Sequence, residues 1–187
     1  MDRRVRRNRG MNDVLAAQVP APGGPGAPES FEALYRRLLP RVYGYVASLL
    51  RDRSAAEDVT AQAFERAYRK RRSYRASRGS ADAWLFGIAR NAALDELRRR
   101  KRRAALAAEP EDALAEDPED QAELALRRET VRTALDSLDG RERDLIALKF
   151  AGGLSNAEIA QLLGMSESNA GTKLHRTLEK LRKACHD

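Results

Sequence analysis

The side chains in this sequence best suited to a specific chemical task lie close together near the C-terminus. They carry amide, hydroxyl, imidazole and cationic groups: Asn169, Thr172, Lys173, His175 and Arg176. Asparagine can read adenine and lysine or arginine can read guanine in the major groove, while cations also hold phosphates. The expected chemistry is therefore recognition of duplex DNA.

Two short helices joined by a tight turn are predicted to position these side chains. The segment Ser155–Glu158 fits a capping box that starts the first helix, and Gly164 suits the left-handed residue that ends it. Ser166 can cap the second helix. The buried stripe of that second helix is expected to be Ala170, Leu174, Leu178 and Leu181. The pattern predicts a helix-turn-helix whose second helix enters the major groove.

Two alternatives stay open for this segment. The same pattern fits a plain helical hairpin with a solvated polar face, although the caps and Gly164 together favour DNA binding. Gly171 lies inside the second helix, where glycine costs up to ~1 kcal/mol relative to alanine. It either permits close approach to a backbone or is simply tolerated.

Helical periodicity also covers residues 30–103. Ser30 is expected to cap a first helix, which Pro40 should kink or divide. "SAAE", residues 54–57, is expected to cap a second helix, and Ser80 a third whose stripe includes Trp84 as a core residue. The first helix has one apolar face: Phe31, Leu34, Leu38, Val42, Tyr45, Val46 and Leu49. Because no useful stretch alternates like a strand, the predicted fold class is all-α.

The charge reverses sharply after the third helix. Six consecutive basic residues, 98–103, are followed by a segment, 104–123, that has eight acids, two prolines and no base. This segment is predicted to be a flexible acidic linker. The expected organisation is a disordered basic arm (1–28), an N-terminal helical bundle (29–103), the linker, and a C-terminal helix-turn-helix domain (124–187).

Composition limits the classes of function. The chain has 187 residues and a net charge of +7, which favours a polyanionic partner, nucleic acid before an anionic membrane surface. One cysteine, Cys185, excludes an intrachain disulfide, and no spacing of metal ligands is present, so we expect no metal and no cofactor. No apolar run could span a bilayer and no signal peptide is recognisable, so we expect a cytoplasmic protein without membrane insertion.

The ordered set of segments resembles the extracytoplasmic-function sigma factors of bacterial RNA polymerase, over residues 31–183. "FEALYRRLLPRVYGYVASLLRD" is similar to the opening helix of that family, and "AEDVTAQAFERAYRK" to its polymerase-binding helix. "RGSADAWLFGIARNAALDELRRRKR" is similar to its promoter-melting helix, and residues 134–182 to its C-terminal helix-turn-helix. The resemblance implies a subunit that binds core polymerase and directs promoter recognition, DNA melting and initiation.

The resemblance also implies roles for particular residues. Asp58, Gln62 and Phe64 fall where the family docks on the polymerase, and Phe64 fits a core position equally well. The C-terminal DNA-reading residues fall where the family reads the duplex −35 element. A second set falls where it captures and contacts the melted −10 strand, for which aromatic and arginine groups beside small residues are suited. This second set is Tyr74, Arg75, Ser77, Arg78, Asn91, Arg98 and Arg99.

The resemblance also implies further partners, and rival functions are distinguished by the residues. The acidic linker is expected to thread a basic channel of polymerase, and an anti-sigma protein is an expected further partner. The main rival is a stand-alone helix-turn-helix regulator, which would bind its operator without polymerase. An enzyme is not expected, because the chain has no glycine-rich phosphate loop and no nucleophile–histidine–acid arrangement.

Overall fold

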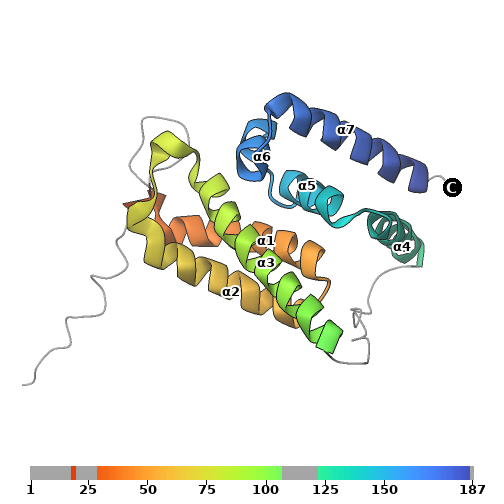
Figure 1. The fold of residues 1–187 in the computed structure, drawn as a ribbon, viewed down its shortest axis with the longest axis horizontal. Coiled ribbons are helices and arrows are strands. Elements are labelled where there is room, and N and C mark those ends of the chain that lie inside the picture. Colours follow the sequence, from red (N-terminus) through yellow and green to blue (C-terminus); the bar gives the residue numbers. More distant parts are fainter. Residues whose placement is uncertain (1–17, 20–28, 107–121, 186–187) are drawn as a thin grey trace, which may run out of the picture.

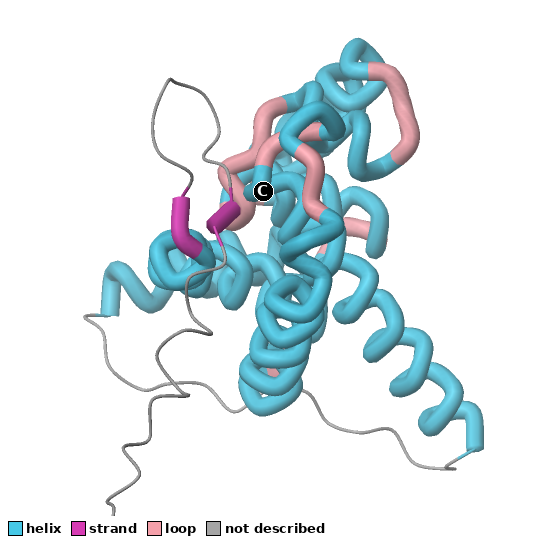
Figure 2. Tube along the Cα trace, turned by 90° about the vertical axis from the view of Figure 1, so that its left-hand side faces the viewer, coloured by secondary structure: helices cyan, strands magenta, loops and turns pink. Residues whose placement is uncertain are grey.

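A computed structural model describes residues 18–19, 29–106 and 122–185, and over these residues the fold is all-α, as predicted (Figure 1). One element departs from the prediction. A two-residue strand β1 (Gln18–Val19) pairs antiparallel with β2 (Glu29–Ser30), directly before the first helix (Figure 2). So short a pairing has no room for the alternation that marks a strand in sequence. Most of the basic arm and the linker residues 107–121 lie outside the described residues.

Three helices form the N-terminal bundle. They are α1 (Phe31–Leu50), α2 (Arg53–Lys70) and α3 (Ala81–Leu106), and two single 3₁₀ turns, η1 (Arg71–Ser73) and η2 (Ala76–Arg78), join α2 to α3. All seven apolar residues predicted for the face of α1 are buried. Pro40 does not divide this helix, because Leu38 and Val42 on either side are both fully buried and hold one continuous face against α2 and α3.

Side-chain caps begin these helices, with one correction to the sequence prediction. Ser30 and Ser80 accept from the amides of Ala33 and Ala83, as predicted. The cap of α2 is Asp52, not Ser54: its extended backbone lets the carboxylate accept from Ala55 N at 2.9 Å. That hydrogen bond first, and contact with an arginine second, lower the pKa of Asp52. A carboxylate also interacts favourably with the positive end of the helix dipole, which explains why α2 starts there.

The C-terminal half contains α4 (Ala122–Asp136), α5 (Gly140–Phe150), α6 (Asn156–Leu163) and α7 (Glu167–Ala184). The predicted helix-turn-helix is present: Ser155 and Glu158 form the capping box, and Gly164 ends α6 with φ 67°. Ser166 caps α7. The prediction that Leu178 belongs to the core is wrong, because this residue is 37% exposed. Thr177 is buried in its place and satisfies its hydroxyl by donating to the Lys173 carbonyl, 2.9 Å away.

The two halves pack directly against each other. Helix α5 lies on α1 and α6 lies on α3 (Figure 1). One continuous set of buried apolar residues runs through both halves. Small residues permit the approach: the Cβ of Ala151 faces Gly44 of α1, and Leu162 faces Gly87 of α3. The sequence predicted two separate modules on a tether and did not predict this contact.

Candidate nucleic-acid and polymerase interfaces

The segment between α2 and α3, residues 71–80, forms a basic loop that is stabilised by the inward-facing side chain of Tyr74. Tyr74 is 8% exposed, its hydroxyl donates to the Gly79 carbonyl at 3.0 Å, and its ring packs on Trp84 with centroids 5.4 Å apart. Tyr74 therefore shapes the loop and presents little free ring to a base. Trp84 is partly buried and packs against the core, in agreement with its prediction as a core residue. Gly79 has φ 133°, which side-chain-bearing residues rarely adopt.

The other predicted residues of this loop face outward. Arg75, Ser77 and Arg78 are exposed, and the backbone around them leaves a cavity of 470 Å³ that reaches Trp84 and Ile88 of α3. Cationic side chains around a hollow with an aromatic wall are the groups that hold a phosphate and an unstacked base together.

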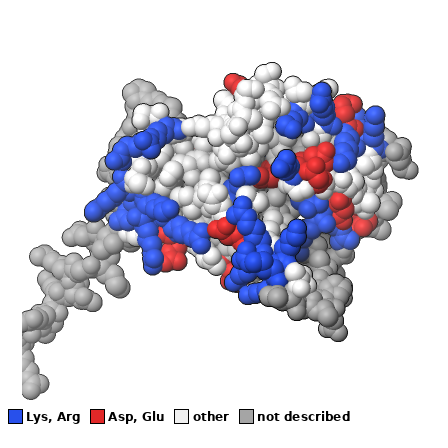
Figure 3. Space-filling view, viewed as in Figure 1, with Lys and Arg blue, Asp and Glu red and all other residues white. Residues whose placement is uncertain are grey.

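At the basic end of α3, some cationic side chains are exposed and one forms ion pairs within the bundle. Asn91, Arg98 and Arg99 are exposed, although Arg98 also pairs with Asp95 within the helix. Arg100 instead points into the bundle. It binds Asp52 and Glu96 at 2.7 and 3.1 Å, and it donates to the Leu50 carbonyl at the end of α1. The helix end and the basic loop are strongly positive areas of the surface in Figure 3.

The face of α2 predicted to dock on polymerase is only partly available. Asp58 and Gln62 are exposed and lie one helical turn apart. Phe64 is 4% exposed and packs edge-on against Tyr35 with ring centroids 4.7 Å apart, so its burial supports the alternative of a core residue. Its ring edge still lines a shallow groove between α1 and α2 together with Pro40.

The C-terminal residues predicted to read DNA share one exposed face of α7. Asn169, Thr172, Lys173, His175 and Arg176 are all exposed, while Ala170 and Leu174 behind them are buried. The alternating exposure confirms the helical face predicted from the spacing. Gly171 faces Asn156 of α6, whose amide nitrogen would lie 3.7 Å from an added Cβ. An alanine would therefore fit at this position without displacing α6.

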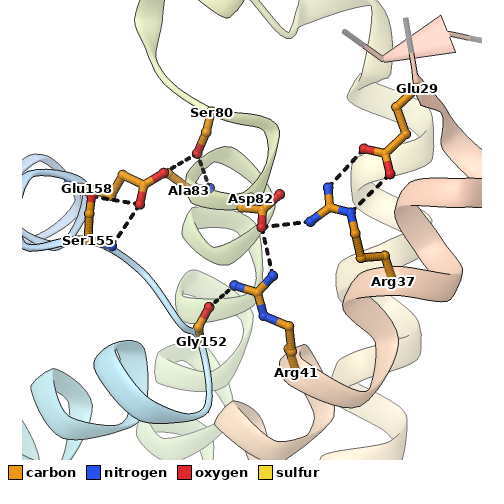
Figure 4. A network of polar contacts seen from close by, with 9 residues as sticks. All are labelled: Glu29, Arg37, Arg41, Ser80, Asp82, Ala83, Gly152, Ser155 and Glu158. Atoms are coloured by element: carbon orange, nitrogen blue, oxygen red, sulfur yellow. Dashed lines mark hydrogen bonds and ion pairs between the residues drawn. The ribbon is translucent and has the colours of Figure 1, made fainter. Parts of the chain in front are cut away.

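A polar network joins the bundle to the C-terminal half (Figure 4). Asp82 accepts from Arg37 and Arg41, each at 2.8 Å, and Arg41 also donates to the Gly152 carbonyl before α6. Burial would raise the pKa of Asp82, but the two arginine hydrogen bonds outweigh it and the pKa ends below its usual value. Beside this network, Ser80 donates to Glu158 of α6. Burial of Glu158 is likewise outweighed by hydrogen bonds from Ser80 and Ser155, which lower its pKa.

The most deeply buried ionic contact among the described residues was not predicted from the sequence. Asp144 of α5 is 4% exposed, and it accepts from the hydroxyl of Tyr45 at 2.8 Å and from Nε of Arg90 at 2.7 Å. Burial above all, and the nearby Asp144 charge, raise the pKa of Tyr45 well above its usual value. The available signal was an acid within the apolar run "DLIAL" of α5, which puts a charge on a helix face that has to be buried.

Comparison with known proteins decides between a sigma factor and a stand-alone helix-turn-helix regulator. The Sigma-70 region 2 family matches residues 34–103, and the Sigma-70 region 4 family matches residues 128–181. RNA polymerase sigma factor CarQ of Myxococcus xanthus is 35% identical over 158 residues, which cover 84% of this chain and 90% of the relative. The chain belongs to the ECF sigma factors.

Further relatives agree with this assignment, and a solved structure shares the fold. ECF sigma factor SigX of Bacillus subtilis is 32% identical, with 83% of each chain covered. SigK of Mycobacterium ulcerans is 31% identical, with 84% of this chain and 86% of the relative covered. The fold matches that of the sigma factor RpoE of Bartonella quintana, solved with the anti-sigma factor NepR. Its TM-score is 0.71 at 24% identity, covering 82% of this chain and 95% of that one.

This ECF sigma factor therefore directs RNA polymerase to promoters and takes part in transcription initiation. Sigma factors are binding subunits and not enzymes. Within the part of the chain that the structure describes, no helix is both long and apolar enough to cross a membrane.

Proposed function

We propose that this sigma factor divides promoter recognition between the two surfaces described above. The basic loop and the exposed end of α3 take the melted −10 strand, and the exposed face of α7 takes the −35 duplex. The single observation that supports this division most strongly is the geometry of α7. Five DNA-compatible side chains share its exposed face, behind which a capped α6 and a left-handed Gly164 set the angle of a helix-turn-helix.

The −10 site is proposed as a cationic hollow and not as a stacking platform. Arg75 and Arg78 supply charge for the phosphates of the single strand, and Ser77 supplies a hydroxyl. Tyr74 acts through its hydrogen bond to Gly79, which fixes the backbone of the loop. Substitution of Arg75 and Arg78 by alanine should reduce promoter opening by holoenzyme, measured by permanganate reactivity of thymines in the melted region. Unchanged opening would contradict the proposed site.

The docking surface for core polymerase is proposed to be the exposed acid and amide of α2. Alanine at both Asp58 and Gln62 should weaken the binding of the sigma factor to core polymerase, measured by competition with a labelled wild-type chain. Glu65→Ala is the matched control, because Glu65 is exposed on the same helix and pairs only with its neighbour Arg69 in the described contacts. Equal affinity of the double variant and the control would exclude this surface.

Two further assignments complete the proposal. The protein acts in the bacterial cytoplasm, where RNA polymerase works. An anti-sigma protein is a proposed partner, since the sigma factor RpoE of Bartonella quintana, which has a similar fold, was solved in complex with the anti-sigma factor NepR. CnrH, also of similar fold, was solved in complex with the cytosolic domain of CnrY. A gel-shift experiment addresses the rival function, because a stand-alone regulator would bind its duplex without core polymerase.

A further inference from the structure

A cavity of 540 Å³ lies where the C-terminal end of α1 meets α4 and α5. Its volume is that of a small-molecule site. It is separate from the proposed DNA and polymerase surfaces, because none of their residues lines it. Part of the lining is apolar and consists of Leu135, Ile146 and Ala147, together with the exposed ring of Phe150. The apolar part of a ligand could therefore leave water here.

Positive charge dominates the polar part of the lining. Among the described residues that form it are three arginines, Arg51, Arg132 and Arg143, and a single acid, Asp136. Asp136 pairs with Arg51. Arg132 pairs at 2.9 Å with Glu129, which is largely exposed and does not line the cavity. The lining residues thus carry an excess of two positive charges.

This excess charge acts on Arg51. Burial first, and then the nearby charges of Arg143 and Arg132, lower the pKa of Arg51. The contact with Asp136 does not reverse the shift. A lowered pKa in an arginine means that its positive charge is poorly compensated, and an anion in the cavity would compensate it.

Two of the three arginines are also held in unfavourable local arrangements. Nε of Arg143 is buried and has no hydrogen-bond partner among the described residues, while one of its Nη atoms donates to the Leu138 carbonyl at 3.0 Å. Arg51 ends α1 with φ 52°, a left-handed conformation that glycine adopts without steric cost. Unsatisfied buried donors and backbone strain of this kind call for an explanation, and ligand sites are one of the places where they gather.

We propose that the cavity between α1, α4 and α5 binds a phosphate monoester with an apolar body. The phosphate lies between the guanidinium groups of Arg51 and Arg143, whose planar sets of N–H donors suit phosphate oxygens. The apolar body lies against Ile146 and Phe150. A phosphate monoester carries a charge of about −1.5 to −2 at neutral pH, which balances the excess of the lining.

This site goes beyond promoter recognition and does not depend on the proposed DNA surfaces. Its walls come from α1 in one half and from α4 and α5 in the other. Because the ligand contacts both, it binds the folded chain and not the unfolded one, and it should raise the melting temperature.

Isothermal titration calorimetry of the full-length chain with phenyl phosphate tests the site, with inorganic phosphate and phenol as separate arms. Phenyl phosphate should bind at one site per chain. It should bind about tenfold more tightly than inorganic phosphate, because its ring is buried against apolar side chains. Phenol lacks the anion and should give no measurable binding over the same concentration range.

Two variants separate a binding role from a structural one. Arg51→Gly removes the guanidinium at a backbone position that suits glycine, so this variant should melt no lower than the wild type without ligand. Its affinity for phenyl phosphate should fall about tenfold, since a charge-assisted hydrogen bond is lost. Arg132→Gln, at an exposed position, should also weaken binding. Arg36→Gln is the matched control, because it removes one positive charge from α1 far from the cavity, where the described partner is Glu32.

Three results would overturn the proposed site. One is the absence of phenyl phosphate binding up to millimolar concentration. Another is equal affinity for inorganic phosphate, which would show that the apolar lining takes no part. The third is a loss of affinity in Arg36→Gln as large as in Arg51→Gly, which would show attraction by net charge alone. None of them affects the proposed function, which is tested separately by transcription with core polymerase.

Discussion

Replacing Tyr45 by phenylalanine tests whether the two halves are packed together in solution. The Tyr45 ring is fully buried, and its hydroxyl donates to Asp144 of the other half at 2.8 Å. The substitution leaves the ring in place, so the change is confined to one hydrogen bond to a charged acceptor, which is worth about 1.5–3 kcal/mol. For a chain of this length, each kcal/mol lowers the melting temperature by roughly 2–4 °C, so the expected loss is about 3–12 °C.

Differential scanning calorimetry gives the measurement, and the neighbouring Tyr43 gives its control. Tyr43 is half-buried on the same helix, and among the described residues its hydroxyl has no hydrogen-bond partner. Tyr43→Phe should therefore melt close to the wild type. If the melting temperature of Tyr45→Phe is no lower than that of Tyr43→Phe, the hydroxyl of Tyr45 has no buried partner. The described packing of α5 on α1 would then be contradicted.

The same residue predicts a pH dependence. Because burial raises the pKa of Tyr45 well above its usual value of about 10, the folded state holds the phenol proton more tightly than the unfolded chain does. This stabilisation is complete below pH ~10 and is lost as the pH rises through the higher folded-state value. Tyr45→Phe should remove this alkaline component from the stability profile, which a series of thermal melts above pH 9 can show.

Three further predictions concern the recognition helix and the polar network. Lys173→Ala and Arg176→Ala should each weaken the binding of holoenzyme to a −35 duplex by ~1–3 kcal/mol, with Lys183→Ala on the same helix as the control in a competition assay. Gly171→Ala should raise the free energy of unfolding by up to ~1 kcal/mol without changing promoter affinity, and a loss of promoter affinity would show that Gly171 faces DNA. Because the pKa of Asp82 is lowered in the fold, its stabilisation is present above pH ~3.9 and disappears as the pH falls through the lower folded value, so Asp82→Asn should flatten the acid limb of the stability curve.

Local patterns in the sequence predicted most of the helices and their ends. The caps at Ser30, Ser80, Ser155 and Ser166 follow from short-range chemistry, because a side-chain oxygen and the amide three residues on are neighbours in any helix start. The error at α2 has the same origin. Two residues that could cap the helix, Asp52 and Ser54, lie two positions apart. Asp52 forms the cap, and Arg100 of a different helix also binds it.

Those local patterns could not predict the contacts between the two halves. In the sequence alone, nothing distinguishes Asp144 from the many other acidic residues of this protein. Its partners Tyr45 and Arg90 are brought to it only by the tertiary structure. Amphipathicity showed which residues prefer burial but not which surface buries them. For the same reason Phe150, the apolar residue at the end of α5, is 63% exposed, while the polar Thr177 is buried.

The predicted roles of the site residues stand on different grounds. The exposed face of α7 was predictable because helical spacing alone places Asn169 and Lys173 on the same side. The loop was only partly predictable, since its composition suggested a stacking tyrosine, whereas Tyr74 turns inward to Trp84 and Gly79. An aromatic residue in a loop can serve a ligand or the loop itself, and its hydrogen bonds decide which.

Run-off transcription with bacterial core RNA polymerase on a library of genomic promoter fragments tests the central claim most directly. We predict transcripts with defined start sites that require both core enzyme and this sigma factor, and that are lost when Lys173 and Arg176 are both replaced by alanine. If the chain fails to bind core polymerase, or yields no defined start sites while it binds duplex DNA alone, two-surface promoter recognition by this protein is contradicted.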